Sequence, residues 1–77
     1  MPTILRSGPY RFFFYSNEGN EPPHVHVESG DMLGKVWLTP IEVADQDGYS
    51  DKEMRKIVEI VAANRAKMEK TWHDYFD

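Results

Sequence analysis

The sequence contains no cysteine, which excludes disulfide bonds, thiolate metal sites and cysteine nucleophiles. It also lacks long apolar runs: Phe12–Tyr15 reaches only four residues, far too few to cross a membrane. It has no excess of basic residues, because the formal net charge is -4. This charge argues against nucleic acid as a ligand, except through a partner, and against binding to an anionic membrane. Met1-Pro2 leads directly into strand-like sequence rather than a secretory leader, so we expect a cytoplasmic protein.

The 77 residues are enough for one domain, which we place at residues 1–77. A chain of this size buries only about 60% of its unfolded surface. The free energy gained by burying this surface is close to the free-energy cost of the conformational entropy lost on folding, so a marginally stable monomer is expected. An oligomer or a partner chain that adds buried surface would relieve this limitation.

Residues 1–44 are typical of strands. The predicted strands are Thr3–Arg6, Tyr10–Ser16, His24–Glu28 and Lys35–Thr39, the last one continuing past a kink at Pro40 into Ile41–Val43. Clusters of Gly, Pro, Asn and Asp separate them. Connections this short favour an antiparallel sheet, since parallel neighbours need long crossovers.

Residues 50–76 are typical of one helix. Ser50 is a good N-cap, and Glu53 three positions later completes a capping-box pattern. An apolar stripe follows at three- and four-residue spacing: Met54, Ile57, Val58, Val61, Met68, Trp72, Tyr75 and Phe76. The expected fold is therefore α+β, a curled antiparallel sheet of three to five strands packed on one long C-terminal helix. Such a helix is about 39 Å long and the globule only about 30 Å across, so the helix must bend, break or overhang.

Two groups of aromatic residues are candidates for an interface. One helix covers one face of the sheet, so Phe13, Tyr15 and Trp37 can line the other face. An overhanging helix end would expose Trp72, Tyr75 and Phe76 in the same way. We expect these six residues to contact a second copy of the chain or a cognate small protein. The alternatives are that loops cover the face, that Trp72 packs on the sheet edge, or that the rings stack on bases.

The most distinctive chemistry is Pro22-Pro23-His24-Val25-His26-Val27-Glu28. Two imidazoles at i and i+2 on a strand share a face, and Glu28 continues the row. His24, His26 and Glu28 are therefore candidate ligands for a divalent metal such as zinc, iron or nickel, and no other cofactor is expected. The same histidines could instead act as general acid and base in phosphodiester cleavage. A purely structural or interface role is the remaining alternative.

Arg65 lies in the middle of the apolar stripe of the helix. It can extend its head to water or pair with Glu28 or Glu42. It can also act as an anion clamp, which makes Arg65 a third candidate catalytic residue beside His24 and His26.

Three parts of the chain carry a family resemblance: Met1–Arg6, Tyr10–Val27 with its Pro-Pro-His-X-His element, and the ending with Asn64-Arg65 and Trp72–Phe76. With them, the chain resembles the prokaryotic domain-of-unknown-function family 4160 over essentially its whole length. The matching residues are Pro22, Pro23, His24, His26, Asn64, Arg65 and Trp72. The resemblance implies a small single-domain protein without a settled activity, encoded in two-gene cassettes of a toxin–antitoxin-like arrangement. It carries no catalytic roles.

The residues and the resemblance together predict a protein-interaction component of a toxin–antitoxin-like pair, acting as a dimer or with a partner chain. The alternative is an enzyme, a small ribonuclease or metal-dependent hydrolase that uses the His-X-His strand.

Overall fold

Strands form in the first part of the chain and one helix in the second. The computed structural model describes residues 3–77, so Met1 and Pro2 lie outside the described residues. The elements are β1 (Thr3–Ser7), β2 (Tyr10–Phe13), β3 (His24–Ser29), β4 (Met32–Leu38), β5 (Ile41–Asp45) and α1 (Asp51–Phe76).

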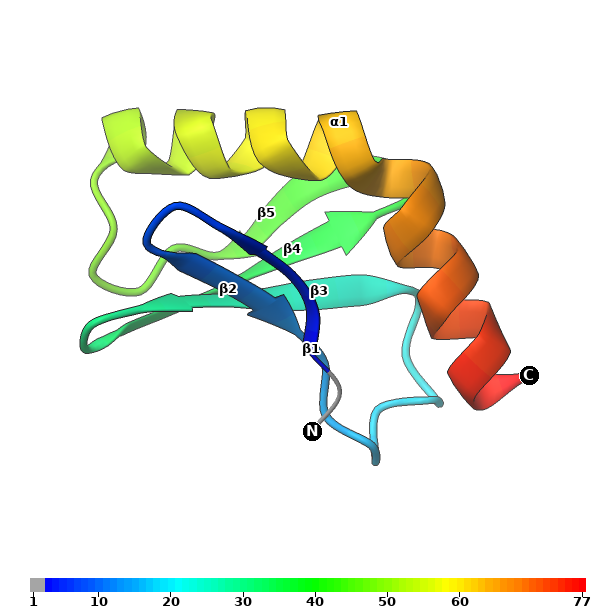
Figure 1. Cartoon of the computed structure of the whole chain (residues 1–77). Coiled ribbons are helices and arrows are strands. Elements are labelled where there is room, and N and C mark those ends of the chain that lie inside the picture. Colours follow the sequence, from blue (N-terminus) through cyan, green and yellow to red (C-terminus); the bar gives the residue numbers. More distant parts are fainter. Residues whose placement is uncertain (1–2) are drawn as a thin grey trace.

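The strands form one sheet in the order β1-β2-β3-β4-β5, and every neighbouring pair is antiparallel. Helix α1 lies across one face of this curled sheet (Figure 1). The predicted α+β fold is therefore confirmed, at the upper end of the expected number of strands. Among residues 3–77, no helix is both long and apolar enough to span a membrane.

Tight turns connect three of the four neighbouring strand pairs, and a longer loop connects β2 to β3. Gly8 and Gly30 have φ angles of 57° and 56°, a region that a residue with a Cβ rarely adopts, and they occupy the turns after β1 and β3. The expected kink at Pro40 is a full turn, whose Thr39–Pro40 peptide bond is cis. The chain reverses there, so β5 pairs with β4 instead of prolonging it.

β2 ends at Phe13, three residues earlier than predicted. From Tyr15 onward the backbone forms successive turns, in which Glu18 N–H donates to Tyr15 O and Glu21 N–H donates to Glu18 O. The strand propensity of the aromatic run is thus overridden by the turn residues that follow it. This loop, residues 14–23, passes over the start of β3 and shapes the candidate site described below.

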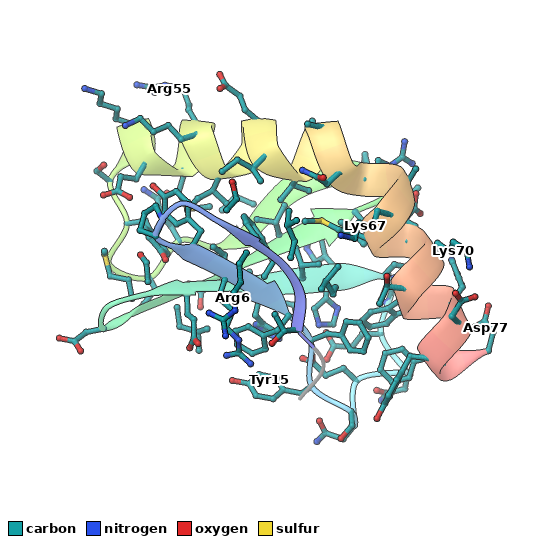
Figure 2. The ribbon with its side chains drawn as sticks, in the orientation of Figure 1. Arg6, Tyr15, Arg55, Lys67, Lys70 and Asp77 are labelled. Carbon is teal, nitrogen blue, oxygen red and sulfur yellow. The ribbon has the colours of Figure 1, made fainter. Side chains whose placement is uncertain are left out.

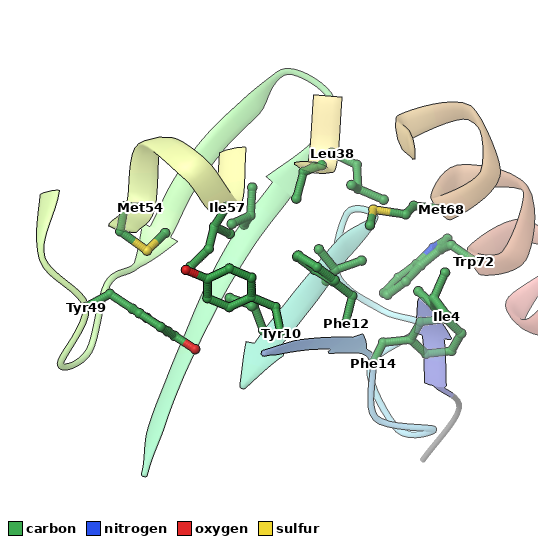
Figure 3. Packing of buried hydrophobic residues seen from close by; sticks show 14 residues of the cluster. Ile4, Tyr10, Phe12, Phe14, Leu38, Tyr49, Met54, Ile57, Met68 and Trp72 are labelled. Carbon is green, nitrogen blue, oxygen red and sulfur yellow. The ribbon is translucent and has the colours of Figure 1, made fainter. Parts of the chain in front are cut away.

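The core lies between the sheet and α1. Phe12, Val25, Val27 and Val36 on the sheet and Ile57 on the helix are completely buried. Figure 3 shows the sheet side chains meeting Met54 and Ile57 at one end and Met68 and Trp72 at the other. The alternation of the strands and the three- and four-residue spacing of the helix therefore face each other across one apolar layer.

The N-cap of α1 forms as the sequence predicts. Ser50 Oγ accepts a hydrogen bond from Glu53 N–H at 3.1 Å. The Glu53 carboxylate is used differently from a capping box, because it accepts a hydrogen bond from the Tyr10 hydroxyl at 2.7 Å. Glu53 therefore links the first turn of the helix to β2.

Helix α1 bends. A straight helix of 26 residues would be about 39 Å long, yet the longest dimension of the molecule is 34 Å. Figure 1 shows the second part of the helix turning past the end of the sheet. We call this part, which carries Lys70 and ends at Phe76, the C-terminal arm; Figure 2 labels Lys70 on it and Asp77 directly after it. Asn64 Nδ2 donates to Ile60 O at 2.8 Å, a side-chain bond to a helix carbonyl of the kind that accompanies bending.

Candidate functional site

A polar cluster made by Glu18, His24 and His26 lies on the face of the sheet opposite the helix. Val25 and Val27 point into the core, so the alternation of β3 turns His24 and His26 to the other face. The loop at residues 14–23 adds the Glu18 carboxylate. One ligand-type atom from each of the three side chains lies within 4.8 Å of the others. We refer to these residues as the Glu-His-His cluster.

His24 is completely buried. Its Nδ1 lies 3.0 Å from the carbonyl oxygen of Pro22. Because a carbonyl only accepts, Nδ1 must carry the proton in this contact. Nε2 lies 3.0 Å from Glu18 Oε1, but the angles do not suit a hydrogen bond, and Nε2 is the buried polar side-chain atom without a partner in the described part of the chain.

The Glu18 carboxylate is nearly buried, with 12% of the side chain exposed. Its two oxygens lie 3.0 and 2.9 Å from His26 Nε2, and it accepts a hydrogen bond from Tyr15 N–H at 2.9 Å. Burial by itself would raise the pKa of Glu18. The hydrogen bonds from His26 and Tyr15 N–H, together with the nearby His24 ring, outweigh that effect, so its pKa lies below the ordinary value.

Aromatic rings surround the two imidazoles. The ring centroids of Tyr15 and Phe13 lie 4.8 and 5.5 Å from that of His26. Those of Trp72 and Trp37 lie 4.8 and 5.5 Å from that of His24. Trp72 reaches His24 because α1 bends, so the core and the Glu-His-His cluster share this side chain. The imidazoles are therefore surrounded by aromatic rings on several sides, and the Glu18 carboxylate is the charged group that contacts them.

The carboxylate next to the histidines is Glu18, not Glu28. Glu28 lies on the predicted face, but it is opposite Arg11 on β2, and the two side chains form an ion pair. Glu18 was missed because it belongs to a turn six positions before His24. The length of the connection could have indicated Glu18, because a loop that joins two adjacent antiparallel strands must return to the start of the second strand.

Arg65 does not join the Glu-His-His cluster in this structure. Its Nε donates to Leu38 O at 2.9 Å, and its Nη2 to Thr39 Oγ1 at 3.3 Å, so its guanidinium binds the end of β4. It also pairs with Glu69 one helical turn later. The side chain extends toward water from the helix side of the sheet, in agreement with the first of the alternatives considered for it.

The six predicted interface residues divide into two groups by burial. Phe13 and Trp72 are buried by this chain, with only 1% and 3% exposed. The reason is local for Phe13, which is covered by the Arg11 guanidinium at 4.5 Å and by the Tyr15 ring. Tyr15, Trp37 and Phe76 are partly exposed, and Tyr75 is half exposed. These four remain accessible to a partner.

A second feature lies at the edge of the sheet formed by β5. Four of its five residues are exposed, including Val43 at 43%. A groove of about 480 Å³ runs between β5 and the first part of α1. It is lined by Val43, Gln46, Asp51, Met54, Arg55, Val58 and Glu59. The sequence reasoning did not predict this groove, because it requires knowing that β5 is the last strand of the sheet.

The geometry defines a class: a small α+β protein with a five-stranded meander, one bent helix and a buried Glu-His-His cluster. The family described as Domain of unknown function (DUF4160) matches residues 10–73, so the chain belongs to this family. The matched region contains all three residues of the cluster, and it confirms the resemblance seen in the sequence. No curated protein and no solved structure matches the chain.

Proposed function

We propose that this chain is a cytoplasmic protein-interaction module, one component of a toxin–antitoxin-like pair, and that it binds a cognate small protein along β5. The single observation that carries the proposal is the open edge of β5 beside an apolar groove. The outer backbone N–H and C=O groups of an edge strand are free to pair with another chain. Addition of a partner strand to such an edge is a common mode of recognition.

The groove provides the second half of such a site. Val43, Met54 and Val58 give it an apolar floor, onto which side chains of an added strand can pack. In β-strand addition, main-chain hydrogen bonds supply affinity and pockets for alternate side chains supply specificity. The edge and the groove adjoin through Val43, so one partner segment can occupy both.

Charge favours a basic partner over a second copy of this chain. Asp51 and Glu59 line the groove and only Arg55 opposes them, while Glu42 and Asp45 lie on β5. Two copies would each bring a net charge of -4, which opposes self-association. The expected occupant is a strand with alternating apolar residues flanked by Lys or Arg.

The enzymatic alternative receives less support from the geometry. A ribonuclease or hydrolase needs its histidines to reach the substrate. His24 is completely buried and His26 is 9% exposed, and aromatic rings surround both. A bacterial host that makes the chain alone should therefore grow normally. Arrested growth that a His24→Ala/His26→Ala variant relieves at the same soluble level would instead support a toxic enzyme.

The test of the interaction uses the product of the neighbouring gene as the partner. Binding is measured by calorimetry for the wild-type chain, for Val43→Glu and for the matched control Leu33→Glu. Leu33 is 36% exposed but lies on β4, outside the groove. We expect Val43→Glu to weaken binding by at least tenfold and Leu33→Glu to leave it unchanged, with circular dichroism confirming that both variants fold.

Two results would contradict the proposal. Equal weakening by the two variants would show that β5 is not the contact. A homodimer at micromolar concentration, measured by light scattering and broken by Val43→Glu, would show that a second copy is the occupant.

A further inference from the structure

We propose that Glu18, His24 and His26 bind one divalent transition-metal ion of the zinc type, with both imidazoles ligating through Nε2. This inference is independent of the partner site on β5. It rests on the donor set, on the tautomer that the structure imposes on His24, and on the charges around the cluster.

The donor set has the right chemistry and spacing. Two imidazole nitrogens and one carboxylate are a common three-ligand set for zinc and related metals. Zinc ligands lie about 2.0–2.2 Å from the metal, so tetrahedral neighbours are about 3.3 Å apart. Glu18 Oε1 lies 3.0 Å from His24 Nε2, and Glu18 Oε2 lies 2.9 Å from His26 Nε2. The ligand atoms, one from each residue, fall within 4.8 Å of one another. Ligation through His26 Nε2 displaces the proton that this atom donates to Glu18, and the proton is released to water when the ion binds.

The tautomer of His24 is the second argument. Nδ1 donates its proton to Pro22 O, so in a neutral imidazole Nε2 presents a lone pair. That lone pair faces the Glu18 carboxylate at 3.0 Å with no hydrogen bond between them. In that neutral form two electron-rich atoms face each other in a buried place, and a bound cation removes their repulsion. A backbone carbonyl that orients a ligating histidine through its other nitrogen is a usual arrangement around metals.

The nearby cationic side chains are used elsewhere. Arg11 pairs with Glu28, and Lys35 pairs with Glu21 at 2.7 Å while its ammonium lies over the Trp37 ring. Neither therefore neutralises Glu18. The aromatic wall around the histidines limits water, which strengthens the attraction between a bound cation and the carboxylate.

Three protein ligands leave one position of a tetrahedral ion for water or for a group from a partner. A bound ion would also join Glu18 of the loop to both histidines of β3, whereas without the ion the Glu18 side chain is hydrogen-bonded to His26 alone of the two. Metal binding is therefore expected to raise the melting temperature of the chain, because the ion binds the folded state only.

The first experiment uses the chain without an affinity tag, and it measures zinc and cobalt binding by equilibrium dialysis and by the visible absorption of cobalt. We expect one equivalent per chain and a higher melting temperature with zinc. Glu18→Gln should weaken binding at least tenfold, and His26→Gln should do the same. The matched controls Glu28→Gln and His73→Gln should bind as the wild type does, because these side chains contact Arg11 and Asp77 instead.

A second measurement needs no variant. Nitrogen-15 spectra of the three imidazoles, recorded with and without zinc, should show large shifts at Nε2 of His24 and His26 and none at His73. No stoichiometric binding at micromolar metal would overturn the proposal. Binding that Glu28→Gln weakens as much as Glu18→Gln, or shifts confined to His73, would overturn it as well. Because Val43→Glu leaves the cluster untouched, that variant should still bind the metal even if it loses the partner.

Discussion

Tyr10 joins the core to a charged group at the start of the helix. Its ring is buried, and its hydroxyl donates to Glu53 Oε2 at 2.7 Å. The hydrogen bond to Glu53, followed by burial and by the negative charge of Glu53, raises the pKa of Tyr10 to about 12. The folded chain thus favours the protonated phenol more than the unfolded chain does.

This contact predicts a loss of stability in strong base. Since the pKa of Tyr10 rises from 10.0 unfolded to about 12 folded, its contribution is complete below pH 10 and disappears as the pH rises to about 12. Tyr10→Phe should destabilise the chain by about 1 kcal/mol at neutral pH, a typical value for one hydrogen bond. Urea unfolding across this pH range would measure both effects, and the variant should lose the late step in tyrosinate absorbance. An unchanged absorbance titration would contradict the assignment.

The Glu-His-His cluster shows how far single residues can be predicted from this sequence. The period of a strand was enough to predict that His24 and His26 share a face, because alternation is a local property. The identity of the carboxylate was not predictable in this way. Glu18 contacts the histidines because the loop that carries it passes next to them. Glu28 does not contact them, because it forms an ion pair with Arg11 on the neighbouring strand.

Arg65 matters at the scale of the helix. It holds α1 to the end of β4 through Leu38 O and Thr39 Oγ1. Its position near the middle of a bent helix makes it a link between the helix and the sheet.

We expect Arg65→Ala to cost about 1 kcal/mol of stability, since a charged donor contributes up to about 3 kcal/mol when buried and this side chain is 44% exposed. Arg65→Lys should recover only part of that loss, because an ammonium lacks the planar fork that reaches both acceptors. Urea unfolding of the two variants provides the measurement. An unchanged free energy of unfolding in Arg65→Ala would show that the contact to β4 contributes nothing to stability.

The elements themselves were largely predictable, and their ends less so. The strand at His24 and the helix from Ser50 follow from alternation and from a capping residue, which act over a few positions. The sequence predicts the end of β2 three residues too late, because the aromatic run has a high strand propensity although a turn begins at Tyr15. The edge position of β5 depends on the complete strand order, which no local pattern contains.

Trp72 acts at the scale of the whole molecule. It packs against Phe14, directly after β2, and against His24 on β3, with ring centroids 5.3 and 4.8 Å away. The bend of α1 makes this possible, because a straight helix would carry Trp72 beyond the sheet.

Trp72→Ala should therefore destabilise the chain by about 3–5 kcal/mol, the usual range for a buried aromatic residue replaced by alanine. That loss is a large part of the stability of a domain this small, so much of the variant is expected to be unfolded near 37 °C. Lys70→Ala is the matched control on the same arm: its ion pair with Asp74 is exposed on both sides, and the change should fall within about 0.5 kcal/mol. Thermal unfolding followed by circular dichroism compares the two. A small effect of Trp72→Ala would contradict the docking of the C-terminal arm.

The order of the strands has a consequence for the speed of folding. Each strand pairs with its successor in the chain, so most contacts within the sheet join residues close in sequence. Chains with such local pairing close small loops first and fold fast for their size. The contacts between the sheet and α1 join residues that are far apart in sequence. Among them, Trp72 packs against Phe14 and lies in the same buried cluster as Ile4, near the other end of the described chain (Figure 3). We therefore expect the hairpin of β3 and β4 to control the folding rate, and the C-terminal arm to control how long the native state lasts before it unfolds.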